Sequence, residues 1–252
     1  MFIDQHGLIV QKDGDGGDTA QREGFLACSD AENSWFPGKC EYSEAVDLLE
    51  VKPGIWVRHP DQWNDPKDFS RDQQTPHVWA MAKHGLKAPL RRMFWAHLKR
   101  FGKYQNWDFM SPEHLGLYIR AFVWIYPWIV IPGSLALYSL LLFGDIFNLI
   151  NTLVRIYKGR KDPDDVGDDL NHLVIIRASQ SFPTPISWIS RVIYFKYRPG
   201  YTWTEVDGKQ IATLDPTGCG PQYALNRYFR AEAGGNPELA LCWRAYNINI
   251  SL

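Results

Sequence analysis

The sequence predicts an all-α protein in which about five helical hairpins form an open (α/α) toroid with small irregular insertions. Helix openings of similar chemistry recur along the chain, in GDTAQREGFLA, DFSRDQQTPHVWAMAK, GDDLNHLVIIRA and PQYALNRYFRAE. Their marker residues, spaced by 54, 97 and 54 positions, are Asp18, Asp72, Asp169 and Tyr223. Because 97 is close to twice 49, a further copy is expected near residue 120, where Arg120 takes the marker position. A period of about 50 residues is typical of helix pairs that bury one face by stacking on their neighbours.

Composition limits the classes of protein to which this chain can belong. Its 252 residues, 45% of them hydrophobic, are enough for a large core, and we expect a single domain over residues 1–252. The net charge of −1 and the pI near 6.7 argue against a nucleic-acid partner, which usually requires a basic face. The 11 Trp, 12 Tyr and 13 Phe residues either fill the core or form stacking platforms, and core filling is the simpler interpretation.

The first 111 residues contain two predicted helix pairs. Residues 2–10 are apolar and β-prone, and a loop rich in Asp and Gly then leads into the first pair. The helices of the two pairs are expected over residues 20–28, 43–50, 70–85 and 89–101. The third of these opens with Ser70 as a capping side chain and Asp72 in its first turn. Residues 55–68 and 104–111 are loops rich in aromatic and polar side chains.

The most apolar run of the chain begins at Ala121 and ends at Phe143, and Pro132 and Gly133 interrupt it. We favour a buried helical hairpin that turns at this Pro-Gly pair. An interfacial or re-entrant membrane segment is a second interpretation, because the Trp and Tyr residues of the run prefer bilayer interfaces. A pair of spanning helices is the third, but a stripe of polar residues at helical spacing would then lie in lipid. This stripe consists of Asp145, Asn148 and Asn151.

The rest of the chain continues the helical pattern around one irregular segment. Helices are predicted over residues 170–180, 186–197, 223–232 and 237–246. Residues 199–220 form an irregular insertion, in which residues 201–205 and 210–213 are expected to pair as a small β-hairpin.

No metal, cofactor or export signal is predicted. The four cysteines contain no C-x-x-C pair, which argues against a zinc site, but Cys28 with Cys40 and Cys219 with Cys242 would pair in an oxidising compartment. An acidic loop that begins at residue 13 lacks the acid that an EF-hand requires at its twelfth position. The N-terminus has only a short apolar run, so no signal peptide is expected. The sequence leaves the localisation open between the cytoplasm and a virion.

If the hairpins curl into a toroid, the polar N-terminal ends of their first helices gather at one mouth. We expect Asp72 as the first catalytic acid or base and Asp169 and Asp18 as the second, because paired carboxylates perform glycan cleavage. The expected binding residues are Arg71, Arg22, Gln73, His172, Trp63 and Asn226. The two arginines would act as charge partners, and Trp63 would stack on a sugar ring. Acids at helix starts also serve as caps, and this structural role competes with catalysis.

In this architecture the chain resembles the incomplete (α/α) toroids found among glycoside hydrolases and polysaccharide lyases, which implies recognition and cleavage of a polysaccharide. The strings DGDGGDTAQREG and RHPDQWNDPKDFSRDQ also resemble tail-region proteins of tailed bacteriophages, which implies a virion protein or an enzyme that acts on host surface glycan. The first alternative is a non-enzymatic virion structural or adaptor protein that binds other virion proteins. The second is a peripheral membrane protein anchored through the run from Ala121 to Phe143.

Overall fold

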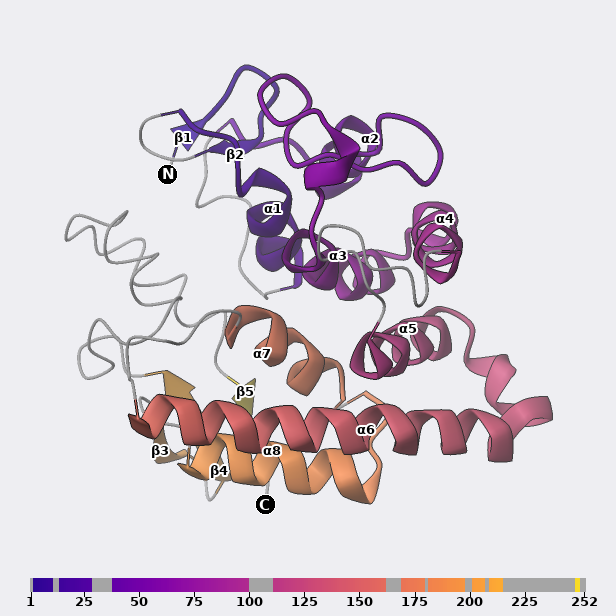
Figure 1. Cartoon of the computed structure of the whole chain (residues 1–252), viewed down its shortest axis with the longest axis vertical. Coiled ribbons are helices and arrows are strands. Elements are labelled where there is room, and N and C mark those ends of the chain that lie inside the picture. Colours follow the sequence, from indigo (N-terminus) through magenta and orange to yellow (C-terminus); the bar gives the residue numbers. More distant parts are fainter. Residues whose placement is uncertain are drawn as a thin grey trace. The chain divides into compact units, whose positions relative to one another are not determined.

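The structure, a computed structural model, describes residues 2–10, 14–28, 38–99, 111–161, 169–179, 181–197, 201–206, 209–214 and 248–249. It is helix-rich, as the sequence predicts, with short strands towards both ends of the chain (Figure 1). The chain divides into two compact units, Met1–Gly144 and Asp145–Leu252, and the boundary between them lies within one helix. The single domain expected over residues 1–252 stays a prediction.

The first unit begins with an antiparallel pair of short strands, β1 (Phe2–Ile3) and β2 (Ile9–Val10). Its helices are α1 (Thr19–Cys28), α2 (Tyr42–Leu49), α3 (Arg71–Lys83), α4 (Lys87–Leu98), α5 (Pro112–Ile125) and the first part of α6 (Val130–Lys161). Short 3-10 helices precede α3 and α6, namely η2 (Pro66–Asp68) and η3 (Pro127–Ile129). The bounds of α1 to α4 agree with the sequence prediction to within three residues.

Helix α3 is the centre of the first unit, with α1 packed on one side and α5 on another (Figure 1). Residues 73–82 of this helix are all buried. The Tyr42 hydroxyl lies 2.7 Å from Nδ1 of His77, and Gln74 donates its amide N–H to the Tyr118 hydroxyl at 2.9 Å. Because buried polar groups are stable when they are hydrogen-bonded, these contacts hold α2 and α5 on α3.

Residues at the two ends of α3 make hydrogen bonds that the sequence only partly predicts. Ser70 is the N-cap residue, but its side chain makes no capping hydrogen bond, so that prediction is wrong. Its carbonyl oxygen instead accepts from the N–H groups of Gln73 and Gln74, both at 3.1 Å. At the other end, Lys83 donates to the Cys28 carbonyl oxygen at 3.0 Å, which satisfies a free carbonyl at the end of α1.

The hairpin predicted in the apolar run forms from α5 and α6, but it is not buried as predicted, since Trp124, Leu135 and Phe143 are exposed. Its turn is also not at Pro132 and Gly133. Both residues lie in the first turn of α6, and the chain turns earlier, through η3. Proline is tolerated in a first helical turn because the N–H groups there have no intrahelical partner. The two helices approach closely at Gly144, where a Cβ would lie 2.8 Å from the Pro112 carbonyl oxygen and 3.2 Å from Cα of Gly116.

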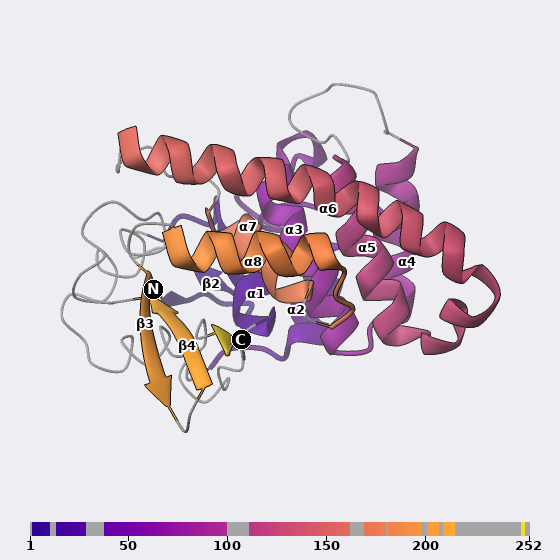
Figure 2. The same ribbon diagram turned by 90° about the horizontal axis from the view of Figure 1, so that it is seen from below.

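The second unit contains the rest of α6, then α7 (Asp169–Ala178) and α8 (Pro185–Tyr197), which runs alongside α6 in both views (Figures 1 and 2). Strands β3 (Tyr201–Val206) and β4 (Lys209–Leu214) pair antiparallel, and β5 (Ile248–Asn249) adds to β4. The predicted hairpin over residues 201–213 is therefore confirmed. The helices predicted over residues 223–232 and 237–246 lie outside the described residues.

Candidate functional site

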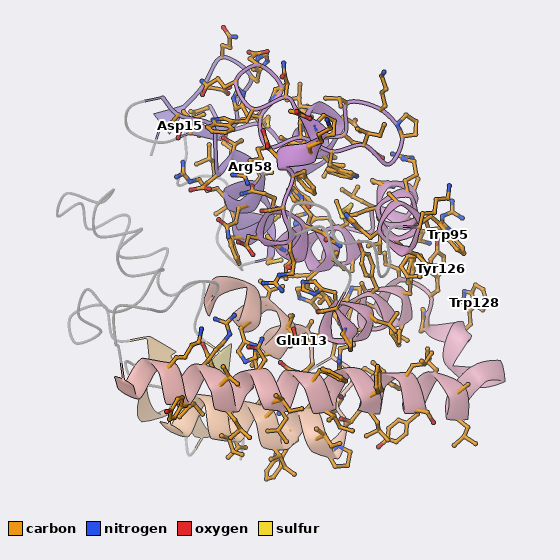
Figure 3. All side chains as sticks on the ribbon, viewed as in Figure 1. Asp15, Arg58, Trp95, Glu113, Tyr126 and Trp128 are labelled. Atoms are coloured by element: carbon orange, nitrogen blue, oxygen red, sulfur yellow. The ribbon has the colours of Figure 1, made fainter. Side chains whose placement is uncertain are left out.

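Two loops meet at the N-terminal end of α1 in the first unit (Figure 3). Gln62 holds the glycine-rich loop before α1, because it accepts from the Gly16 N–H and donates to the Gly14 carbonyl oxygen, each at 2.8 Å. The indole N–H of Trp63 donates to the Asp15 carboxylate at 2.7 Å. The strings DGDGGDTAQREG and RHPDQWNDPKDFSRDQ, distant in the sequence, therefore lie against each other.

Arg58 stabilises this junction. Its guanidinium donates to the Gly17 carbonyl oxygen at 3.4 Å and lies 5.9 Å from the centre of the Trp63 ring, where the aromatic quadrupole attracts a cation. Gly16 is required by close approach, since a Cβ at this position would lie 2.5 Å from the His59 ring. The outcome is a positioned indole that is still 39% exposed.

Five other predicted site residues lie at or near the starts of α1 and α3. Arg22 lies 3.6 Å from the Asp18 carboxylate, one helical turn away, and Asp18 is 38% exposed. Gln73 is buried, and its side-chain oxygen accepts from the Gln21 backbone N–H at 2.8 Å. Two more residues are half-buried at the start of α3, namely Arg71 and Asp72. The structure thus brings the starts of α1 and α3 together.

The remaining predicted site residues lie in the second unit or outside the described residues. Asp169 begins α7 and His172 lies on the same helix, both in the second unit. His172 is buried, with its Nε2 2.9 Å from the Thr152 hydroxyl and its ring packed edge-on against Tyr194. Asn226 lies outside the described residues. The convergence of Asp169, His172 and Asn226 with α1 and α3 stays a prediction.

A buried ion pair lies close behind the junction. Glu23 is fully buried, and its carboxylate lies 2.8 Å from the Lys39 ammonium and accepts from the Ile9 N–H at 2.9 Å. Burial raises the pKa of Glu23, while the Lys39 charge and the Ile9 N–H act in the opposite direction. Because it is enclosed and fully engaged, Glu23 has a structural role.

The junction offers carboxylates, guanidinium groups and an exposed indole, which suit a polar ring with one apolar face. A ligand could reach Asp18 and Trp63 from solvent, and Asp72 is half-buried, whereas Gln73 is occupied by its bond to α1. Within the described ranges, no group of three or more His, Cys, Asp or Glu side chains is placed to hold a metal ion.

A second feature lies in α6, which directs polar side chains inward. The Asp145 carboxylate accepts from the Thr184 hydroxyl at 2.6 Å. The Thr152 hydroxyl lies 2.9 Å from Nε2 of His172 and 2.7 Å from the Ser190 hydroxyl. These contacts join α6 to α7 and to α8 and its preceding turn through buried polar side chains.

The outward side of the same helix is apolar. Its exposed residues in the second unit are Ile146, Phe147, Ile150, Leu153, Val154 and Tyr157, and α8 adds Trp188 and Ile189. The stretch Leu135–Lys158 is long and apolar enough to cross a membrane, and 28% of its most apolar window is buried. Proteins in water keep most large apolar side chains inside, and this part of the chain reverses that distribution.

The sequence prediction of membrane contact ended at Phe143, and it missed the exposed apolar side that continues to Tyr157. The polar residues that follow Phe143 argue, in the sequence alone, against a pair of spanning helices. In the structure Asp145 and Asn148 are buried among helices, so they do not face the surroundings of α6. The alternation of apolar and polar residues at a period of three to four was the signal that could have indicated a two-sided helix.

Comparison with known protein families, with curated proteins and with solved structures finds no match for this chain. The resemblances to (α/α) toroids and to phage tail-region proteins therefore stay predictions. Only the geometry of the described residues bears on function.

Proposed function

We propose that this chain is a membrane-associated protein whose second unit rests on a lipid bilayer through the exposed apolar sides of α6 and α8. The observation that carries the proposal is the reversed distribution in α6, which buries Asp145 and Thr152 and exposes Ile150 and Leu153. Burial of a large apolar side chain is worth about 1.5–3 kcal/mol, so removing several half-exposed ones from water gives a substantial driving force.

Residues at the end of α6 fit a bilayer interface. Tyr157 is 58% exposed, and its neighbour Lys158 is exposed. Trp188 on α8 is exposed as well. Tyr and Trp prefer the headgroup region, and cations are attracted to anionic lipids there.

The second unit favours a helix that lies along the bilayer over one that crosses it. The turn between α7 and α8 meets α6 at Asp145, near the middle of the stretch Leu135–Lys158. Ser181 and Pro183 in this turn are exposed. If α6 spanned the membrane, this irregular turn with its exposed Ser181 would lie in hydrocarbon, which membrane proteins avoid. An in-plane helix keeps the turn near the interface.

The test is synthesis of the full chain in the presence of phospholipid vesicles, followed by flotation in a density gradient. We expect the wild-type chain to float with the vesicles. Ile150→Glu should lower its partition at least about 10-fold, because a charge placed in the apolar layer costs roughly 2 kcal/mol or more. Val51→Glu is the matched control, since Val51 is 44% exposed in the first unit and should leave flotation unchanged.

A chain that stays in the dense fraction and sediments as a soluble dimer would contradict the proposal. That result would indicate that a second copy of the chain covers the apolar side of α6. Equal loss of flotation in Ile150→Glu and Val51→Glu would also contradict it, because the effect would then not be specific to α6.

Polysaccharide recognition by an open toroid is the second candidate function. The positioned Trp63, at the junction of the two loops before α1, favours it. Helices α1, α3 and α5 are the first members of successive pairs and are neighbours in the first unit, which is the order that a toroid requires. Asp18 and Asp72 at this junction would supply the acid and base in a glycan-cleaving enzyme. In a non-enzymatic virion protein the same residues would only cap and pair.

A panel of bacterial capsular and cell-surface polysaccharides tests this second candidate. We expect Trp63→Ala to abolish binding, because the ring loses its stacking face, and Asp72→Asn to retain binding but abolish cleavage. Binding that is unchanged in Trp63→Ala would remove the junction as a glycan site. Loss of folding in Asp72→Asn would assign that residue a structural role.

A further inference from the structure

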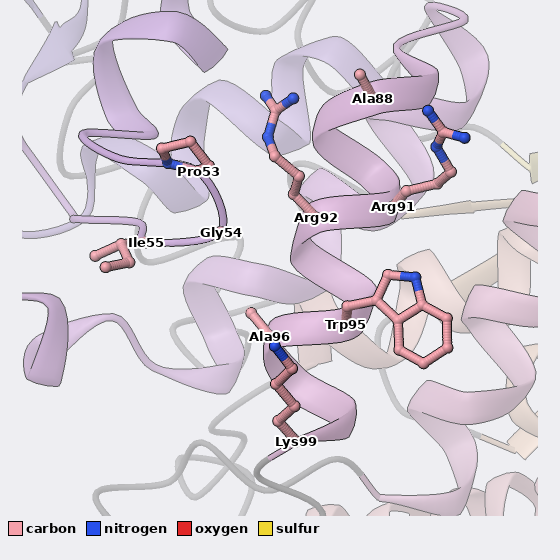
Figure 4. Close-up of a pocket in the computed structure, with 9 residues that line it drawn as sticks. All are labelled: Pro53, Gly54, Ile55, Ala88, Arg91, Arg92, Trp95, Ala96 and Lys99. Atoms are coloured by element: carbon pink, nitrogen blue, oxygen red, sulfur yellow. The ribbon is translucent and has the colours of Figure 1, made fainter.

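A basic groove lies along one side of α4 in the first unit (Figure 4). Its volume is about 600 Å³, and the turn at residues 53–55 forms its other wall. The α4 residues that line it are spaced by three or four positions and so share one helical face. They are Ala88, Arg91, Arg92, Trp95, Ala96 and Lys99.

The cations of this groove have different partners. Arg92 forms a two-point ion pair with Glu50, whose carboxylate also accepts the Gly54 N–H at 2.7 Å. This arrangement ties α4 to the turn and uses the Arg92 charge internally. Arg91 and Lys99 are exposed, and neither pairs with a carboxylate among the described residues.

The lining residues therefore supply two available cations and no acid. The planar guanidinium of Arg91 matches the oxygen atoms of a phosphate, and Lys99 adds a second positive charge about two turns along the same helix. This combination is suited to an anionic group, and a phosphate ester has the matching geometry.

Aromatic side chains around the groove point to a membrane lipid as the source of that phosphate. Trp95, within the groove, is 56% exposed. At the start of α4 the Lys87 ammonium lies 5.2 Å from the centre of the Tyr126 ring, and Tyr126 packs edge-on against Trp128, which is 63% exposed. Figure 3 shows Trp95, Tyr126 and Trp128 along one edge of the first unit. Exposed Trp and Tyr beside cations are typical of a bilayer interface.

We infer that the α4 groove binds the phosphate of an anionic lipid headgroup. This inference rests on the proposed membrane association and deepens it, since it names the lipid class that the first unit recognises. A soluble phosphate ester has the same chemistry, and the experiment separates the two sources.

The experiment compares flotation of the full chain on vesicles of phosphatidylcholine alone and on vesicles that also contain phosphatidylglycerol. Each cation near an anionic surface strengthens binding by about 5-fold. We expect Arg91→Gln/Lys99→Gln to bind vesicles with phosphatidylglycerol at least roughly 20-fold more weakly than the wild type does. Its binding to vesicles of phosphatidylcholine alone should equal that of the wild type. The matched control is Lys52→Gln/Lys67→Gln, which removes the same charge from exposed positions outside the lining and should cost less than about 3-fold.

Calorimetric titration with glycerol 3-phosphate provides the second arm. Equal binding of the wild type to both vesicle types would overturn the headgroup site and leave membrane association standing. Groove-dependent binding of glycerol 3-phosphate without a preference for phosphatidylglycerol would overturn the lipid assignment, because the ligand would then be a soluble phosphate ester. Equal losses of binding to phosphatidylglycerol vesicles in the two double variants would overturn the site, because the net charge of the protein would then explain the binding. Failure to float on any vesicle would overturn both proposals.

Discussion

Helices α3 and α6 both bury polar side chains, but their surroundings are opposite. Around α3, buried His77 and Gln74 are bonded to neighbouring helices, and the apolar residues are buried beside them. In α6, Asp145 and Thr152 are bonded inside, while Ile150 and Leu153 face outward. Hydrophobicity therefore predicts burial in the first helix and fails to predict it in the second. Helix α3 is therefore packed as in a protein surrounded by water, whereas the outer side of α6 is suited to an apolar medium.

Removal of the Lys39 charge should have the largest effect on the stability of the first unit. Lys39→Met leaves the Glu23 carboxylate buried without its cation, which costs about 3–5 kcal/mol of unfolding free energy. Thermal unfolding followed by tryptophan fluorescence measures the loss. Glu23→Gln/Lys39→Met should recover most of it, and Lys67→Met, at an exposed position, should change stability by at most about 0.5 kcal/mol.

If Lys39→Met were no more harmful than Lys67→Met, the buried ion pair would not be part of the core. The contrast between α3 and α6 would then weaken, because the polar interior of the first unit would tolerate unpaired charge.

Acid should destabilise the first unit more than an exposed histidine could explain. Burial lowers the pKa of His77 to about 4, and burial followed by the nearby Arg71 charge lowers the pKa of His114 to about 3. In the unfolded chain both histidines have a pKa near 6.5. Below that pH the unfolded state therefore binds more protons than the native state. Stability is therefore full above about pH 6.5 and is lost as the pH falls, by roughly 1.4 kcal/mol per pH unit for each histidine.

Unfolding of the wild type and of His77→Gln across this pH range measures the effect. The variant should show a shallower loss between pH 6.5 and 4, and His6→Gln, at a half-buried position where the hydrogen bond with Asp61 raises the pKa of the histidine, should not. Identical slopes in all three proteins would contradict a neutral, buried His77.

The smallest expected effect concerns the contact between α5 and α6. Gly144→Ala should cost about 1–3 kcal/mol, because the added Cβ would lie 2.8 Å from the Pro112 carbonyl oxygen. Gly116→Ala is the matched control, since its Cβ would meet Arg120 at 3.5 Å and Cα of Gly144 at 3.7 Å, which are ordinary contacts. That variant should be neutral or stabilising, because alanine favours helix. Equal costs in unfolding experiments would mean that α6 does not pack closely on α5.

The sequence predicted local elements better than the direction in which they face. Periodicity and turn chemistry located α1 to α4 and the β3–β4 hairpin, because these signals are local. Pro132 misled the prediction of the turn, since proline is compatible with the first turn of α6 as well as with a loop. The spacing of Asp145 and Asn148 showed a polar stripe, but spacing alone does not say whether such a stripe faces other helices or the surroundings.

The candidate sites followed the same division. The proximity of Asp18, Arg22 and Gln73 could be anticipated because all three lie near helix starts of similar chemistry. The bond between Trp63 and Asp15 depends on how two loops fold against each other, which no local pattern reveals. Nor could the α4 groove be anticipated, because its second wall comes from residues 53–55.

Spin labels on α6 are the sharpest test of whether its outer side faces lipid. Single cysteines at Ile146, Ile150, Leu153 and Tyr157 would be labelled in a chain whose native cysteines are replaced by serine, and bound to vesicles. We expect all four labels to be accessible to oxygen, shielded from a water-soluble nickel reagent, and at similar depth, as an in-plane helix requires. Nickel accessibility equal to that of a label at exposed position 67 would contradict lipid contact of α6. A label depth that changes along α6 would indicate a spanning helix in place of an in-plane one.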